Sequence, residues 1–196
     1  NRIAAVGRAG QVPIPAGAQI INAAGKWITP GLVDAKANYY SVWGEGYLIW
    51  GVTSLMESGG KGDVGTAERD AINHGIFEGP RLYNAVAVLN GPGPDGRKVD
   101  ATVPGRGYVV RTPEQAREMA RTLLDADADF LTVGDGDGDP AIFAPIAEEA
   151  QKAGKANVWR LMGPQTRARE GAALAPGLVC IHTSNINTHN TKEPKK

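Results

Sequence analysis

From Pro30 onward, short apolar runs alternate with helical segments, and this alternation limits the possible folds more than any other feature of the sequence. Such a pattern is typical of β-strands joined by crossover helices, which form a parallel sheet. The expected strands are residues 31–35, 52–56, 82–89, 130–133, 157–161 and 178–181. About six strands in this order fit either a doubly wound sheet or part of a (β/α)8 barrel, and periodicity alone does not choose between them.

Two of the helices between these strands have clear start signals. Thr112-Pro113-Glu114-Gln115 forms a capping box with proline at the first helical position. A second helix is expected to begin at Asp139-Pro140 and to stop at Gly154. In both, apolar residues recur at the i, i+3, i+4 spacing, which predicts one face packed against the sheet.

The two ends of the chain differ from this βα region. Residues 1–29 alternate short apolar runs with glycine and proline, which predicts a short antiparallel β region. Residues 185–196 are polar and aperiodic, as expected of a loose tail. The sequence therefore predicts three segments: a β region at 1–29, a βα domain at 30–184 and a polar tail at 185–196.

The charges balance, with 21 Lys+Arg against 21 Asp+Glu among 196 residues. A net charge of zero gives no long-range attraction to nucleic acid or to an anionic membrane surface. No apolar stretch is long enough to span a bilayer. The single cysteine, Cys180, cannot form an internal disulfide, which is consistent with a reducing compartment. We therefore expect a cytoplasmic protein without nucleic-acid or membrane partners.

Residues 25–38, with the run Pro30-Gly31-Leu32-Val33-Asp34, resemble the opening of an amidohydrolase-superfamily enzyme. In that family a small β-sandwich leads into such a run, which ends in His-x-His on the first barrel strand. The likeness extends to about Ser184 and is strongest to imidazolonepropionase-like and prolidase-like members. The resemblance implies a partial TIM-like (β/α) barrel of about six parallel strands, preceded by a segment of the sandwich. It also implies zinc or another divalent metal and hydrolysis of amide, dipeptide or cyclic amide bonds.

The residues at the family's metal-ligand positions differ from the family pattern. Lys36 and Asn38 replace the His-x-His pair, Thr132 replaces the strand-four lysine, and Arg160 replaces the strand-five histidine; only His182, on strand six, matches. Lys36 and Arg160 would direct two cations at a site meant for a dication. At an effective dielectric near 20, a unit-charge pair at 4 Å costs about 4 kcal/mol. We therefore expect no metal or other cofactor in this chain.

The favoured interpretation is an amidohydrolase-family barrel protein that lacks the metal site and is inactive. One alternative is an active metal-dependent amidohydrolase, acting on a small amide or dipeptide, whose sequence is incomplete or misassigned at these positions. Another is an engineered or non-catalytic scaffold or binding protein. Six strands leave two open sheet edges, which predicts self-association or a missing C-terminal part.

Overall fold

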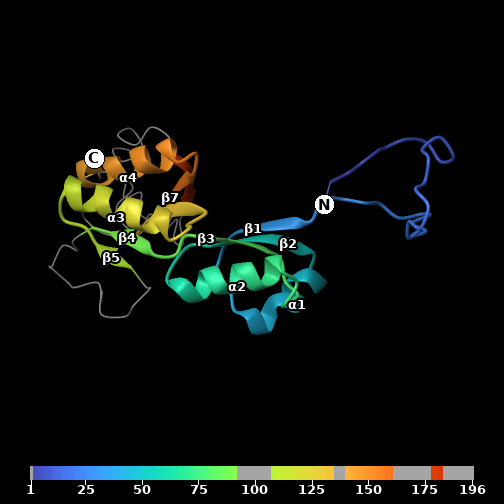
Figure 1. Cartoon of the computed structure of the whole chain (residues 1–196), viewed down its shortest axis with the longest axis horizontal. Coiled ribbons are helices and arrows are strands. Elements are labelled where there is room, and N and C mark those ends of the chain that lie inside the picture. The colour runs from blue at the N-terminus through green and yellow to red at the C-terminus, as the bar shows by residue number, and fades with distance from the viewer. Residues whose placement is uncertain (1, 92–106, 135–139, 161–177, 183–196) are drawn as a thin grey trace, which may run out of the picture. The chain divides into compact units, whose positions relative to one another are not determined.

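The computed structural model describes residues 2–91, 107–134, 140–160 and 178–182 (Figure 1). For Pro140, Arg160 and residues 178–182, only the backbone is described. The chain divides into two compact units, Asn1–Pro30 and Gly31–Lys196. Because their relative placement is not fixed, each unit is described by itself.

The first unit contains no strand within residues 2–30. Its backbone hydrogen bonds close local turns, such as Gln11 N–H to Arg8 O at 3.0 Å and Lys26 N–H to Ala23 O at 3.0 Å. This corrects the expectation of an antiparallel β region at residues 1–29. A strand needs a hydrogen-bonded neighbour, and the apolar runs that suggested strands, including Ile20-Ile21 and Trp27-Ile28, remain exposed without one.

The second unit has α/β architecture. Its strands are β1 (Leu32–Ala37), β2 (Val52–Glu57), β3 (Arg81–Asn84), β4 (Val88–Asn90), β5 (Tyr108–Val109), β6 (Phe130–Val133), β7 (Ala156–Arg160) and β8 (Leu178–His182). Its helices are α1 (Gly44–Ile49), preceded by the 3-10 helix η1 (Ser41–Trp43), α2 (Asp63–Asn73), α3 (Pro113–Asp125) and α4 (Pro140–Lys152). The strands form two sheets, with orders β1-β2-β3 and β5-β4-β6-β7-β8, and every strand pair is parallel. The expected parallel α/β fold is confirmed.

The expected strand at 82–89 is split into β3 and β4, and this break separates the two sheets. β3 pairs with β2, whereas β4 pairs with β6 and β5. Between them Val86 has a φ of 62°, a conformation that a β-branched residue rarely adopts and that interrupts an extended strand. Hydrogen bonds continue across the break, from Ala85 N–H to Glu57 O and from Asp129 N–H to Asn84 O. With β3 and β4 taken as one strand and the two-residue edge strand β5 set aside, six parallel strands follow in chain order.

Helices α3 and α4 lie side by side in Figure 1 and cover one face of the second sheet. The Thr112 hydroxyl accepts a hydrogen bond from Gln115 N–H at 3.2 Å, so the predicted cap of α3 is confirmed. α4 begins at Pro140, as predicted. The cluster between helices and sheet contains Leu89, Ala116, Ala120, Leu123, Leu131, Val133, Phe143, Ile146, Ala150 and Trp159 among its buried residues.

Side-chain alternation assigns the two faces of the sheets. Leu131 and Val133 on β6 pack toward α3 and α4, so Phe130 and Thr132 face the opposite, inner side. Phe130 packs there with Ala85 and Val158. A separate cluster of Ala37, Tyr39, Leu55 and Leu82 packs against Tyr47 of α1 and Ile72 of α2 on the outer side of the first sheet. The inner face therefore corresponds to the inside of a partial barrel.

Candidate functional site at the barrel mouth

Lys36 and Asn38 lie at the carboxyl end of β1, where parallel barrels carry their active sites. Lys36 is half-buried and Asn38 is exposed. Their neighbours Ala37 and Tyr39 pack into the outer cluster. Because successive side chains of an extended segment point to opposite faces, Lys36 and Asn38 are directed toward the inner face.

Thr132 occupies the inner face of β6, two strands along from β2. Its side chain is 0% exposed, and its Oγ1 has no hydrogen-bond partner among the described residues. Its register partners are Val88 on β4 and Val158 on β7. Thr132 therefore lies in the wall of the barrel, with a buried hydroxyl that no described group satisfies.

Arg160 and His182 end the neighbouring strands β7 and β8 and face each other in the register. Cys180, two residues before His182, is the partner of Val158, two residues before Arg160. The backbone thus brings both positions to the same carboxyl edge that Lys36 occupies on β1. Their side chains lie outside what the structure describes.

Ser58 is a residue of the mouth that the sequence-based analysis missed. It directly follows β2, is 3% exposed, and its Oγ has no hydrogen-bond partner among the described residues. The next residue, Gly59, has a φ of 98°, and a Cβ there would lie 2.9 Å from the carbonyl carbon of Ala87. The chain after Ser58 therefore runs close against Ala87. The sequence feature that could have identified Ser58 is a polar residue at the end of a strand, followed by two glycines.

Glu57 is a second missed residue, and it anchors the segment that follows β1. Its carboxylate is 1% exposed and accepts the Tyr39 N–H at 2.5 Å. Burial raises the pKa of Glu57, whereas the Tyr39 hydrogen bond and the nearby positive charges of Lys61 and Lys36 lower it. Lys61 also pairs with Glu68 of α2 at 2.6 Å. These contacts hold the end of β1 against β2 and α2, which fixes the place of Lys36.

Known structures share this arrangement of strands and helices. No family model matches the chain, and no curated protein sequence matches it. An amidohydrolase structure superposes with a TM-score of 0.67 at 21% identity, covering 87% of this chain and 52% of the other. A Bifidobacterium longum protein assigned as a prolidase gives 0.69 at 22% identity, with coverages of 87% and 44%. A Xaa-Pro dipeptidase gives 0.62 at 18% identity, with coverages of 78% and 47%.

The chain shares the fold of these three structures. It spans about half the length of the solved amidohydrolase, prolidase and dipeptidase chains that it matches. The expectation drawn from the Pro30–Asp34 run is confirmed at the level of the fold. Among the described residues, no helix is long and apolar enough to cross a membrane.

The side chains described at the mouth of the partial barrel do not suit a divalent metal. Zinc and similar ions bind neutral imidazole, carboxylate or thiolate, whereas the inner face presents the Lys36 ammonium, the Asn38 amide and the hydroxyls of Ser58 and Thr132. Within the described ranges, no three His, Cys, Asp or Glu side chains gather into a group that could hold a metal ion. The residues that the structure shows here are mainly hydrogen-bond donors.

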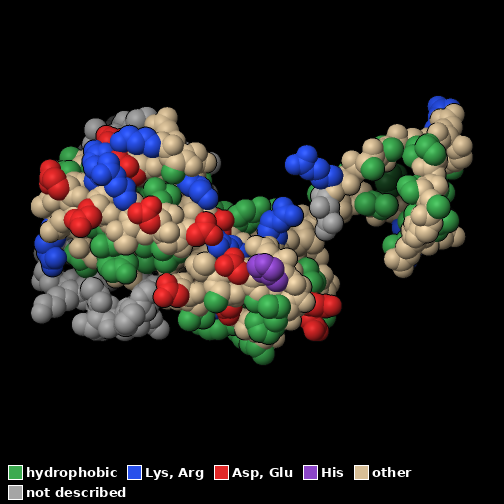
Figure 2. Space-filling view, viewed as in Figure 1, with side chains coloured by type: hydrophobic (Ala, Val, Ile, Leu, Met, Phe, Trp, Pro, Cys, Tyr) green, Lys and Arg blue, Asp and Glu red, His purple; other side chains and the backbone are tan. Residues whose placement is uncertain are grey.

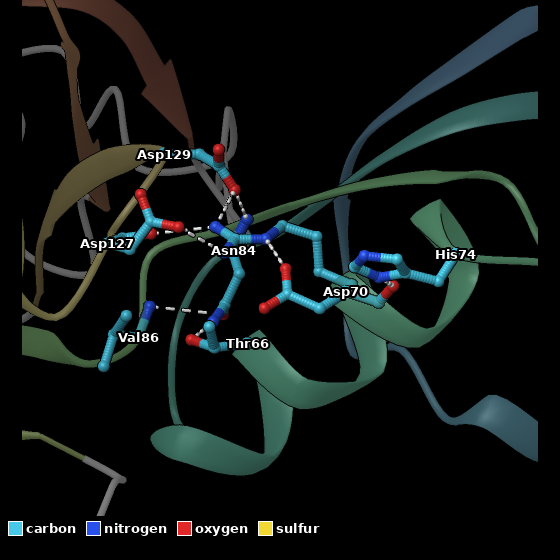
Figure 3. A network of polar contacts seen from close by, with 8 residues as sticks. Thr66, Asp70, His74, Asn84, Val86, Asp127 and Asp129 are labelled. Carbon is cyan, nitrogen blue, oxygen red and sulfur yellow. Dashed lines mark hydrogen bonds and ion pairs between the residues drawn. The ribbon is translucent and has the colours of Figure 1, made fainter. Parts of the chain in front are cut away.

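A polar network built around Arg69 of α2 lies near the start of β6, at the other end of that strand (Figure 3). Buried Arg69 contacts Asp127 at 2.6 Å, Asp70 at 2.9 Å and Asp129 at 3.0 Å. Burial alone would lower the pKa of Arg69, but these hydrogen bonds raise it above its ordinary value. Asp129 also accepts the Asn84 N–H at 2.9 Å. Every partner is satisfied, and contacts at this end of a barrel serve stability.

Proposed function

We propose that this chain belongs to the amidohydrolase family but retains the barrel as a binding scaffold without metal-dependent hydrolysis. The observation that carries the proposal is the pair Lys36 and Asn38 at the carboxyl end of β1, where a cation and an amide stand at the positions of two imidazoles in the family pattern. The fold shared with an amidohydrolase, a prolidase and a dipeptidase supports the hydrolase ancestry.

Electrostatics makes Lys36 incompatible with a neighbouring dication. At 4 Å and an effective dielectric near 20, an ammonium and a dication repel each other by about 8 kcal/mol. That repulsion is comparable with much of the binding free energy of a structural zinc, which is on the order of 10 kcal/mol or more.

Metal analysis combined with an activity assay tests this proposal. The purified chain is dialysed against zinc or manganese and then against metal-free buffer, and bound metal is measured by mass spectrometry. Hydrolysis of an Xaa-Pro dipeptide is followed by amine release. We expect much less than one metal per chain and no hydrolysis above the buffer. Near-stoichiometric metal accompanied by turnover would overturn the proposal.

A double variant, Lys36→His with Asn38→His, gives the test a positive arm. Two imidazoles on the inner face should raise the bound metal above that of the original chain. The matched control is Val33→His with Ala35→His, which places the same i, i+2 pair at exposed positions of β1. If both pairs raise metal binding equally, the inner face of β1 has no special role.

The second candidate function is metal-dependent amide hydrolysis by a longer protein. It is favoured by His182, which ends β8 in register with Arg160, and by the chain covering about half of its structural neighbours. Under this alternative the metal arm of the same experiment gives the opposite result, and His182→Ala abolishes metal binding.

A further inference from the structure

We propose that the outward side of α1 forms a two-fold interface with the same surface of a second copy of this chain. This surface, called the α1 face below, consists of Val42, Trp43, Gly46, Ile49 and Trp50. The interface is independent of the proposed function, because α1 packs on the outer side of the first sheet, away from the inner face of the partial barrel.

The helical segment formed by η1 and α1 carries apolar side chains on both of its sides. Tyr47 packs against the outer cluster of the first sheet and marks the inward side. Val42, Ile49 and Trp50 are 81%, 80% and 81% exposed. With Gly46 they follow the i, i+4, i+7, i+8 spacing that places side chains on one side of a helix. A helix that is apolar all round is normally buried, yet no residue in the described ranges covers this side.

Trp43 widens the α1 face at its edge. It is 58% exposed and meets the ring of Tyr40 edge-on, with the ring centroids 5.6 Å apart. Tyr40 is itself 51% exposed. Between residues 40 and 51 the only charged residue is Glu45. Figure 2 shows hydrophobic side chains gathered over α1. The α1 face is therefore an aromatic and aliphatic surface with very little charge.

The area of the α1 face matches one side of a dimer interface. A fully accessible aromatic side chain exposes about 150 to 250 Å² and a valine or isoleucine about 100 Å². At the exposures of these residues and Tyr40, the apolar surface amounts to about 500 Å². A stable interface buries about 800 Å² on each partner, of which about 60% is apolar, so it needs about the same apolar area. Apolar patches of this size commonly mark an interaction site.

Charge and symmetry favour a second copy as the occupant. An apolar stripe is complementary to itself, as a two-fold interface requires, and two-fold dimers are the commonest assemblies of soluble proteins. The α1 face offers no cluster of charges that would select a partner of opposite charge. Because the net charge of the chain is zero, no net repulsion opposes the approach of two copies.

Gly46 gives the α1 face a shape that a second helix can fit. It lies in the middle of the stripe, and a Cβ at this position would meet nothing within 4 Å in the described part of the chain. The missing side chain leaves a gap between the bulky side chains of Val42 and Trp50. A side chain of the second copy can enter this gap, so the two helices can approach closely where they cross.

Sedimentation equilibrium of the purified chain, between about 1 and 100 μM, tests the interface. We expect a dimer. Trp50→Ser should raise its dissociation constant at least about thirtyfold, because a central tryptophan is a typical hot spot. Gly46→Leu should raise it about tenfold or more by filling the gap, although the leucine adds apolar surface. If Gly46→Leu instead strengthened the dimer, the association would be non-specific adhesion and the assignment would be wrong.

Matched controls separate the α1 face from general hydrophobicity and from folding. Trp27→Ser removes a tryptophan of the first unit that is 94% exposed, and it should leave the dissociation constant unchanged. Trp50→Ser should keep the urea midpoint of the monomer, measured by circular dichroism below the dissociation constant, because Trp50 is exposed. Equal weakening by the two tryptophan variants would refute the assignment. A dimer that neither Trp50→Ser nor Gly46→Leu weakens would form through another surface, such as an open sheet edge, and would refute it as well.

A chain that stays monomeric at about 100 μM would overturn the proposal. Cosedimentation with phosphatidylcholine vesicles then identifies the occupant. Vesicle binding that Trp50→Ser abolishes would assign the α1 face to a lipid surface, and the absence of vesicle binding would assign it to a further polypeptide segment. None of these outcomes changes the metal analysis, so failure of the dimer and failure of the proposed function are distinguishable.

Discussion

Glu149→Gln is the substitution that best tests how α3 is held against α4. The Glu149 side chain, 8% exposed, contacts Arg117 at 2.6 Å and Arg121 at 3.0 Å from α3, and Lys152 at 2.8 Å from its own helix. Figure 2 shows acidic and basic side chains interspersed over these two helices. The glutamine keeps the shape of the side chain but removes the charge that these three cations share.

The expected magnitude follows from the pKa of Glu149. Hydrogen bonds from Arg121, Lys152 and Arg117 lower this pKa from 4.5 to about 2. Such a difference between the unfolded and folded values corresponds to about 3 kcal/mol of stability at pH 7. Arg121 and Lys152 are 59% and 62% exposed, and solvent screens exposed partners. We therefore expect Glu149→Gln to lower the free energy of unfolding by about 1 to 2 kcal/mol.

Urea unfolding followed by circular dichroism, at pH 7 and at steps down to pH 2, measures this effect. Because the folded pKa is depressed, the stabilisation is complete above about pH 4.5 and disappears as the pH falls toward 2. The difference in the free energy of unfolding between wild type and the Glu149→Gln variant should disappear over that pH interval. Glu148→Gln is the control, since Glu148 is 47% exposed and its one ion pair among the described residues is with Arg117; it should cost less than about 0.5 kcal/mol. A gap that stays constant from pH 7 to pH 2 would refute the reasoning.

Two further predictions concern the rest of the second unit. Arg69→Met should lower the free energy of unfolding by about 3 kcal/mol, because it removes the buried partner of Asp127 and Asp129. The control is Arg81→Met, at an exposed position beside the same network, which should cost less than about 0.5 kcal/mol. Equal losses for the two variants in urea unfolding would contradict a stabilising role of Arg69. We also propose that the chain self-associates through β1 and β8, which end their sheets in the described residues; light scattering should show a mass that rises with concentration, and a constant monomer mass would exclude it.

The fold was largely predictable because its strands and helices carry strong local signals. The capping box at Thr112 and the proline at Pro113 fixed the start of α3, and the apolar stripe of α4 matched its buried face. The break at Val86 was not predictable, because a valine inside the run 82–89 gives no local sign of a positive φ. The absence of strands in residues 2–30 was missed for a similar reason, since strand patterns do not reveal whether a hydrogen-bonded partner exists.

The candidate site was predictable only in part. The position of Lys36 and Asn38 at the end of the first strand could be predicted from the Pro30–Asp34 run. The position of Thr132 on the fourth strand could be predicted from the order of the strands. Ser58 and Glu57 were missed because their role depends on contacts between segments that are far apart in the sequence, such as the Tyr39 N–H to Glu57 bond. Whether a polar residue is buried and unsatisfied is a property of packing, which periodicity does not report.

The break between β3 and β4 also divides the second unit into halves of unequal cohesion. In the described residues, the cluster around β4, β6, α3 and α4 contains fourteen buried apolar side chains, whereas the one around β1, β2 and α2 contains four. The β1–β2 half should therefore open locally, with faster amide hydrogen exchange, while the other half stays folded. Lys36 and Ser58 belong to the first half and Thr132 to the second. Any contact that joined the two halves would suppress this opening and make them unfold as one cooperative unit.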